Sequence, residues 1–394
     1  MSTLFRTTPD MGAPNSWPRP IHAIWQLGVA VLVLSTLPFN VTRYYITRTG
    51  YTTLWRYLFF RGVRTMSLLN PFLPPADTVK GASAIPRHII GITKEMRSTI
   101  NIDVVHVPPL PLADQRGFAT IPPGAPVEAI DRPLYIFSSK NAFARGQEPA
   151  CEGEKAIIYF HAGGYNEGHP TALPLGAKVA IRTRLRVFTP NYRKTLSTDT
   201  AYPAPLLDIM AAYKYLGDLG FSPKDIIVMG DSVGGHLTMA LVTQLHELGQ
   251  PMPGALAMSS PWVDLTFSYP SWSSPHDIVF KHKLKRAIRS AMRYYTPEAA
   301  LHPFFSPPLA PRGTWTFLKD TPVYASYGEL ESFADEGKAL LRGLQDDGVS
   351  VDIQVDEGGI HIEPSLAWHG PEAESRFLAG LNALVAGMDK SSGP

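Results

Sequence analysis

The chain has 394 residues, of which 44% are hydrophobic, and this is enough for a sizeable buried core. Its 36 Lys and Arg residues nearly balance its 34 Asp and Glu residues, which argues against a nucleic-acid partner because such proteins need a concentrated basic face. Cys151 is the only cysteine, so neither an intrachain disulfide nor a zinc site built from several thiolates is possible.

The N-terminal part of the chain begins with a polar segment and continues with an apolar one. Residues 1–20 are rich in Pro, Ser and Thr and are predicted to be disordered. Residues 21–42 contain an uncharged run from Ile24 to Phe39, slightly shorter than the ~20 residues of a comfortable membrane span. Three interpretations of this run are open: a membrane anchor, a helix that packs on the rest of the protein, and a cleaved signal.

Aromatic and basic side chains alternate in the segment that follows, residues 43–100. This pattern predicts a helical extension or cap, whose apolar faces either lie on a bilayer or cover an apolar cleft; an ordinary helical layer with solvated arginines is the alternative. Arginines are more frequent after the apolar run than before it, which favours the cytosolic side for the remaining chain. The prediction is a membrane-associated protein, with the endoplasmic reticulum as a candidate membrane.

Strands and helices alternate through the segment 101–394. Apolar runs predict strands at 155–160, 186–189, 225–229, 254–258, 322–326 and 349–355, and helical spacing predicts helices at 206–219, 235–248, 333–344 and 372–386. Such alternation predicts an α/β fold with a mostly parallel sheet covered on both faces. Residues 265–315, with many Ser and Pro residues and one basic helix at 281–295, predict a lid insertion over the strand ends or a surface excursion.

A G-x-S-x-G motif, Gly230-Asp-Ser-Val-Gly234, lies between a predicted strand and a predicted helix. The chain must reverse tightly there, which strains the serine backbone and requires small neighbours. A helix that begins at Val233 favours negative charge beside Ser232. We therefore predict that Ser232 is a catalytic nucleophile.

A second glycine turn, His161-Ala-Gly-Gly-Tyr165, follows the strand at 155–160. Glycines let backbone N–H groups face a substrate oxygen without obstruction from side chains. The N–H groups of Gly163, Gly164 and Val233 are predicted to form an oxyanion hole, in which each donor contributes on the order of 3 kcal/mol to the transition state.

The two motifs resemble the hormone-sensitive-lipase branch of the α/β-hydrolases, whose members carry HGGG before GDSAGG. The matching segments here are 161–164, in which Ala162 replaces the first glycine, and 230–235; residues 260–265 resemble the family's S-P-W-x-D-L segment. The resemblance covers about residues 150–390 and implies an esterase without a cofactor or metal, with a cap partly built from N-terminal helices. The hydrophobic N-terminus further resembles membrane-associated fungal acetyl-ester hydrolases.

The resemblance also implies an acid and a base. The first aspartate of the family's D-P-L-x-D-E-G segment is the triad acid, and Glu331 stands at that position here, with Asp335 as the alternative acid. The base is expected on a loop after a strand, and His361 in Gly358-Gly-Ile-His361 follows the predicted strand at 349–355 and resembles the family's G-x-x-H. His369 is the alternative base.

The function predicted from these residues is hydrolysis of an apolar carboxylic ester, such as a lipid, a sterol ester or a specialised metabolite, through an acyl-enzyme. An acyltransferase or amidase would use the same three side chains, and a ligand-binding homologue without catalysis is a further alternative. Neither a cofactor nor a metal is expected, because no histidine has metal-ligand spacing with a partner.

Overall fold

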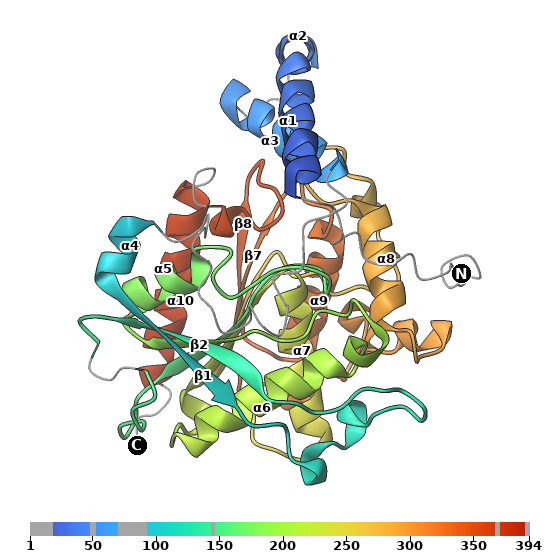
Figure 1. Ribbon diagram of the computed structural model, residues 1–394. Helices are drawn as coiled ribbons and strands as arrows, with labels where there is room; N and C mark the ends of the chain where they lie inside the picture. Colours follow the sequence, from blue (N-terminus) through green and yellow to red (C-terminus); the bar gives the residue numbers. More distant parts are fainter. Residues whose placement is uncertain (1–18, 48–52, 70–92, 143–145, 367–370, 391–394) are drawn as a thin grey trace.

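An eight-stranded sheet runs through the centre of the protein, with helices on both faces (Figure 1). The computed structural model describes residues 19–47, 53–69, 93–142, 146–366 and 371–390. The strand order is β1-β2-β4-β3-β5-β6-β7-β8; β2 is antiparallel to β1 and β4, and the other neighbours are parallel. The predicted α/β fold with a mostly parallel sheet is confirmed.

The strands are β1 (Ile100–Val107), β2 (Arg132–Ser139), β3 (Ala156–Phe160), β4 (Arg186–Pro190), β5 (Ile226–Asp231), β6 (Ala255–Ser259), β7 (Val323–Gly328) and β8 (Val351–Asp356). Every residue of the strands from β2 to β7 is buried. Continuous apolar runs are typical of parallel strands covered on both faces, which is why the sequence predicted β3 to β7. The edge strand β8, also predicted, has alternating apolar and polar residues and is mostly half-buried or exposed. The sequence did not single out β1 and β2, the antiparallel pair at one edge.

Helices cover the two faces of the sheet. They are α5 (Leu175–Thr183), α6 (Ala204–Asp218), α7 (Val233–Glu247), α9 (Ala334–Asp346) and α10 (Pro371–Lys390), together with the short α4 (Lys94–Thr99). Successive strand residues point to opposite faces, so Ile158 packs in one apolar cluster with α6, α7 and α9, and Ile157 packs in the other with α5 and α10. The sheet therefore has a core on each side.

The long connection between β6 and β7 contains the segment predicted as a lid. Its helix α8 (Lys281–Ala291) is four residues shorter than the predicted helix at 281–295. The helix ends early because the chain turns to pack Tyr295 against Tyr202 and Phe305, with ring centroids 6.2 and 5.2 Å apart. The helical spacing of the sequence could not show this tertiary contact.

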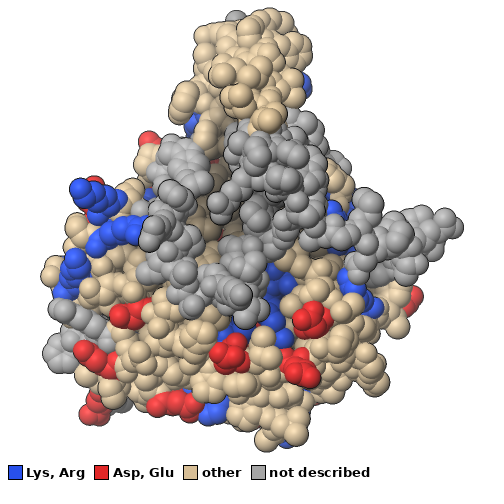
Figure 2. Space-filling model, in the orientation of Figure 1, with Lys and Arg blue, Asp and Glu red and all other residues tan. Residues whose placement is uncertain are grey.

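Three N-terminal helices project from one end of the molecule: α1 (Arg19–Ser35), α2 (Leu37–Thr47) and α3 (Leu54–Leu69) (Figure 1). The stretch Leu27–Ile46 is long and apolar enough to cross a membrane by length and composition, and only 6% of its most apolar window is buried. Figure 2 shows few charged side chains on the visible face of this projection. Much of its apolar surface is exposed, and the three interpretations of the apolar run stay open.

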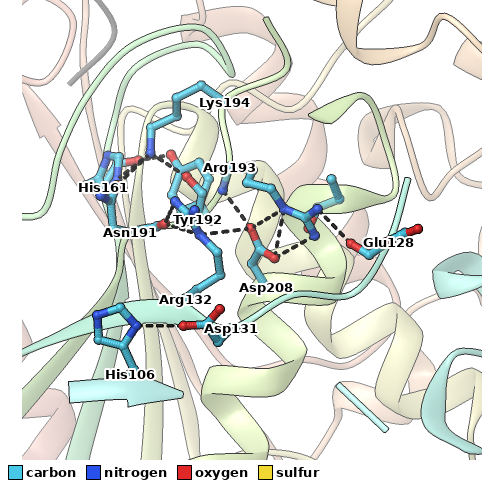
Figure 3. Close-up of polar contacts among 11 residues, drawn as sticks. His106, Glu128, Asp131, Arg132, His161, Asn191, Tyr192, Arg193, Lys194 and Asp208 are labelled. Carbon is cyan, nitrogen blue, oxygen red and sulfur yellow. Dashed lines mark hydrogen bonds and ion pairs between the residues drawn. The ribbon is translucent and has the colours of Figure 1, made fainter. Parts of the chain in front are cut away.

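A buried ion pair ties the segment after β4 to α6 (Figure 3). The Arg193 guanidinium donates to the Asp208 carboxylate through Nη2 at 2.8 Å and Nε at 3.0 and 3.1 Å, and through Nη1 to the Glu128 carbonyl at 2.7 Å. The Arg193 backbone N–H also donates to Asp208, at 2.7 Å. Both side chains are at most 4% exposed, so their charges are compensated inside the protein and not by water. Arg132 Nε, 3.7 Å from Asp208 Oδ2, is a second cation beside the same carboxylate.

We predict that Asp208→Ala lowers the free energy of unfolding by about 3–5 kcal/mol, because it leaves the Arg193 guanidinium buried without its anion. Asp218→Ala is the control, since Asp218 pairs with Lys214 on the exposed surface of the same helix, and a loss below about 0.5 kcal/mol is expected there. Urea unfolding followed by circular dichroism measures both. Equal losses in the two variants would contradict this account of the pair.

Candidate active site

Ser232 occupies the sharp turn between β5 and α7, with φ 55° and ψ −121°. A side chain at positive φ is strained unless its surroundings hold the backbone in place. Here the Ser232 N–H donates to the Ser259 carbonyl at 3.0 Å, and the Ser232 carbonyl accepts from the Trp262 N–H at 2.9 Å. The N–H and the carbonyl of Ser232 are therefore both hydrogen-bonded to β6 or to the segment that directly follows it.

The small residues of the motif are required by close backbone contacts. A Cβ atom on Gly230 would lie 2.1 Å from the Gly234 carbonyl oxygen, and one on Gly234 would lie 1.8 Å from the carbonyl oxygen of Phe160. Side chains at these two positions would force the turn open. The sequence motif is thus a consequence of how closely the chain must pass itself to present the serine.

The side chains of Ser232 and His361 are in contact. His361 Nε2 lies 2.9 Å from Ser232 Oγ, across a chain separation of 129 residues. Both residues are 5% exposed, and the imidazole edge packs against the Phe333 ring with centroids 4.6 Å apart. This is the distance expected between a nucleophile and its general base. His369, the alternative base, lies outside the described residues.

Glu331 lies on the other side of the imidazole, just after β7. Its Oε2 is 3.9 Å from His361 Nδ1, which is within ion-pair range and beyond a hydrogen bond. Within the described part of the chain, Glu331 Oε1 and His361 Nδ1 have no hydrogen-bond partner. Catalytic hydrogen bonds are often long in unliganded enzymes and shorten in the substrate complex. The structure brings Glu331 near the base without closing the bond.

Asp335, the alternative acid, faces another segment. Its Oδ2 accepts the Ser271 N–H at 2.9 Å, and its own N–H donates to Ser271 Oγ at 3.2 Å. These bonds fix the start of α9 to the connection between β6 and β7. No contact between Asp335 and His361 is recorded among the described residues.

The glycine turn after β3 is held by its carbonyl groups. The Gly163 carbonyl accepts from the N–H groups of Asn166 and Glu167 at 3.1 and 2.9 Å, and a Cβ atom on Gly163 would lie 1.9 Å from the Glu167 carbonyl oxygen. Gly163 and Gly164 have φ values of 137° and 56°, which other residues rarely adopt. The oxyanion role of Gly163, Gly164 and Val233 stays a prediction.

His161 anchors the start of this turn (Figure 3). Its ring stacks on Tyr192 with centroids 4.5 Å apart, and its carbonyl accepts from the Tyr192 hydroxyl at 2.6 Å. Lys194 Nζ lies 3.4 Å from His161 Nε2 and donates to Asn191 Oδ1 at 3.1 Å. Burial and the nearby lysine charge lower the pKa of His161 well below its usual value, so His161 is neutral at pH 7.

Buried carboxylates that were not predicted surround the site, among them Asp231 and Asp277. Asp231 accepts from Ser365 Oγ at 2.9 Å, which ties the nucleophile turn to the segment after His361. Asp277 accepts the His361 N–H at 3.1 Å and the Ser332 N–H at 2.7 Å, so it joins the base segment to the acid segment. Asp231 could have been noticed inside the motif, whereas no local pattern distinguishes Asp277.

Burial decides the charge of the proposed base at rest. It lowers the pKa of His361 to about 4, against an opposing effect of the Asp277 charge. The imidazole is therefore neutral at pH 7, which is the form that accepts a proton from serine. Burial also raises the pKa of Glu331 well above its usual value, because the charged carboxylate is removed from water. A cationic imidazole beside it stabilises the carboxylate and opposes this rise in pKa.

Comparison with known proteins places this chain in a protein family. A profile of the alpha/beta hydrolase fold matches residues 157–363, just over half of the chain. An acetyl-hydrolase of Streptomyces hygroscopicus is 27% identical over 222 residues, 56% of this chain and 70% of that protein. An esterase of Acinetobacter venetianus is 30% identical over 167 residues, 42% of this chain and 52% of that protein.

A solved structure agrees with these relatives. The crystal structure of a hormone-sensitive lipase from a metagenome library matches with a TM-score of 0.56 at 25% identity, covering 65% of this chain and 82% of that one. The predicted resemblance is confirmed at this level, while the closer likeness to fungal membrane-associated enzymes stays a prediction. The chain belongs to the α/β-hydrolase fold family, in the branch of ester hydrolases related to hormone-sensitive lipase.

Proposed function

We propose that the chain is a serine carboxylic-ester hydrolase that works through an acyl-enzyme on Ser232. The observation that carries this proposal is the buried contact of 2.9 Å between Ser232 Oγ and His361 Nε2. A hydroxyl becomes a nucleophile at neutral pH when an unprotonated base accepts its proton, and His361 is unprotonated there.

The chemistry follows from this contact. Ser232 Oγ attacks the ester carbonyl carbon while its proton passes to His361 Nε2, and the N–H groups of Gly163, Gly164 and Val233 stabilise the resulting oxyanion. The imidazolium returns the proton to the leaving alcohol, and the C–O bond of the ester breaks. Water then attacks the acyl-enzyme with the same proton transfers, which releases the carboxylic acid and restores Ser232. Glu331 orients the imidazole and stabilises its cation.

The proposed substrate is an apolar ester, which the surroundings of the site support. A Cβ atom on Gly164 would lie 2.9 Å from the Leu284 side chain, 3.7 Å from Asn166 Oδ1 and 3.9 Å from the Trp262 ring. Apolar groups from α8 and from the segment after β6 therefore border the glycine turn, together with one amide oxygen. Relatives described as an acetyl-hydrolase and an esterase favour water as the acyl acceptor over an amine or a second alcohol.

The α1–α3 projection is the proposed contact with a lipid surface. Its exposed apolar side chains include Ile24, Leu27, Leu34, Phe39 and Trp55, each at least 62% exposed. Exposed clusters of this kind are characteristic of membrane-binding or protein-binding surfaces. The proposal concerns a bilayer surface and names no particular organelle.

We predict that Ser232→Ala abolishes hydrolysis of p-nitrophenyl butyrate and labelling by a fluorophosphonate, because both need the same oxygen nucleophile. A fall of at least about 10⁴-fold in kcat is expected. The thermal unfolding midpoint, which reports the fold, should stay close to that of the native protein. Substantial turnover by a purified Ser232→Ala variant would contradict a mechanism with Ser232 as the nucleophile.

The identity of the acid is tested by comparing two isosteric changes. Glu331→Gln is expected to lower kcat by about 10²–10⁴-fold, because an amide does not stabilise the imidazolium. Asp335→Asn should cost less than about tenfold, since Asp335 binds backbone N–H groups of another segment. Steady-state kinetics give both values, and the reverse ranking would transfer the acid role to Asp335.

The membrane proposal predicts that the full chain co-sediments with phosphatidylcholine vesicles. Leu27→Asp combined with Leu34→Asp should lower the bound fraction at least about tenfold, because charges on the apolar face oppose entry into lipid. Leu112→Asp is the control, since Leu112 is 83% exposed but belongs to a short helical turn outside α1–α3. The proposal fails if both variants bind like the native chain.

A further inference from the structure

The helix α3 makes polar contacts with the segment that bears His361, although the two are far apart in sequence. Arg56 Nη2 lies 2.5 Å from Glu363 Oε1, across a separation of 307 residues. The Glu363 side chain is 3% exposed, and its other oxygen, Oε2, accepts the Ile360 N–H at 3.1 Å. One carboxylate thus joins α3 to the residue immediately before His361.

A second arginine of α3 reaches the other side of the same segment. The Arg64 guanidinium donates to the Asp277 carbonyl and lies over the Phe280 ring, 4.7 Å from its centroid. Asp277 is 1% exposed and its Oδ1 accepts the His361 N–H at 3.1 Å. The chain of contacts therefore runs from α3 through Asp277 to the backbone of the proposed base.

The two chains of contacts have the same construction. In each, an arginine of α3 binds a residue whose buried carboxylate accepts one backbone N–H of the pair 360–361. The Arg56 guanidinium donates directly to the buried Glu363 carboxylate, which needs such a donor. The Arg64 guanidinium instead binds the main-chain carbonyl of Asp277 and so fixes the residue that carries the second carboxylate. Removal of both arginines would loosen the backbone that sets the direction of the His361 ring, while Ser232 would keep its own support from β5, β6 and α7.

We propose that Arg56 and Arg64 are positioning residues, through which α3 completes the active site by holding the His361 segment against Ser232. This inference rests on the proposed function and assigns to the N-terminal helices a part in catalysis beyond membrane contact. A shift of the imidazole by about 1 Å costs on the order of 10²-fold in rate, so the orientation of this segment bears directly on turnover.

The experiment compares arginines of one helix. Arg56→Met, Arg64→Met and the double variant remove the contacts, while Arg56→Lys keeps the charge that faces Glu363. Arg61→Met is the matched control, because Arg61 Nε donates to Asn40 Oδ1 at 3.2 Å, within the helical projection itself. Each full-length variant is assayed with p-nitrophenyl butyrate, and kcat is expressed per active site titrated with a fluorophosphonate, so that unfolded protein does not count.

We expect kcat per titrated site to fall about ten- to a hundredfold in the double variant and at least about threefold in each single one, with KM changed by less than about threefold. Arg56→Lys should recover most of the kcat that Arg56→Met loses. The kcat of Arg61→Met should stay within about twofold of the native value. A role in stability alone would lower the titrated fraction and leave kcat per site unchanged.

The proposal is overturned if Arg56→Met and Arg64→Met both keep the native kcat per titrated site, or if Arg61→Met loses as much as they do. If the double variant does not fold, the two single variants decide in the same way. Failure of the proposed function is a separate result, because the native chain itself would then resist fluorophosphonate labelling at Ser232.

Discussion

The backbone turn at Ser232 is the constraint on which the site depends. A serine held at φ 55° between β5 and α7 directs its hydroxyl out of the sheet edge, and this conformation persists only because the neighbouring chain leaves no alternative. The approach of Gly234 to Phe160 and the bonds from Ser232 to Ser259 and Trp262 fix the turn from both sides. The parallel sheet supplies the rigid edge that those contacts require.

The proposed base depends on a different kind of support. His361 follows β8 on a segment with little regular structure, and buried carboxylates bind the backbone or side chains around it: Asp277 at its own N–H, Glu363 at Ile360, and Asp231 at Ser365. Buried anions of this kind need hydrogen-bond donors to hold one arrangement. Backbone N–H groups donate to Asp277 and Glu363, the Arg56 guanidinium donates to Glu363, and Arg64 binds the Asp277 carbonyl, so α3 is joined to the catalytic centre by direct contacts.

The sequence predicted the features that arise from local backbone geometry and failed for those that arise from distant contacts. Gly163 and Gly234 are glycines because the chain passes within 2 Å of where a Cβ would lie, and a motif records that directly. No local motif marks Asp277 or Arg56, because their partners His361 and Glu363 are 84 and 307 residues away in sequence. The position of Glu331 was predicted through a family resemblance, yet its 3.9 Å separation from His361 could not have been.

The central claim is that a hydroxyl, an imidazole and a set of backbone N–H groups converge on one carbonyl. A crystal structure of the chain after reaction with a phosphonate ester tests it most directly, because the tetrahedral phosphorus imitates the acyl intermediate. The account predicts phosphorus bonded to Ser232 Oγ and one phosphonyl oxygen directed at the N–H groups of Gly163, Gly164 and Val233, about 2.7–3.1 Å from at least Gly164 and Val233. An adduct on another residue, or a phosphonyl oxygen directed away from these groups, would contradict it.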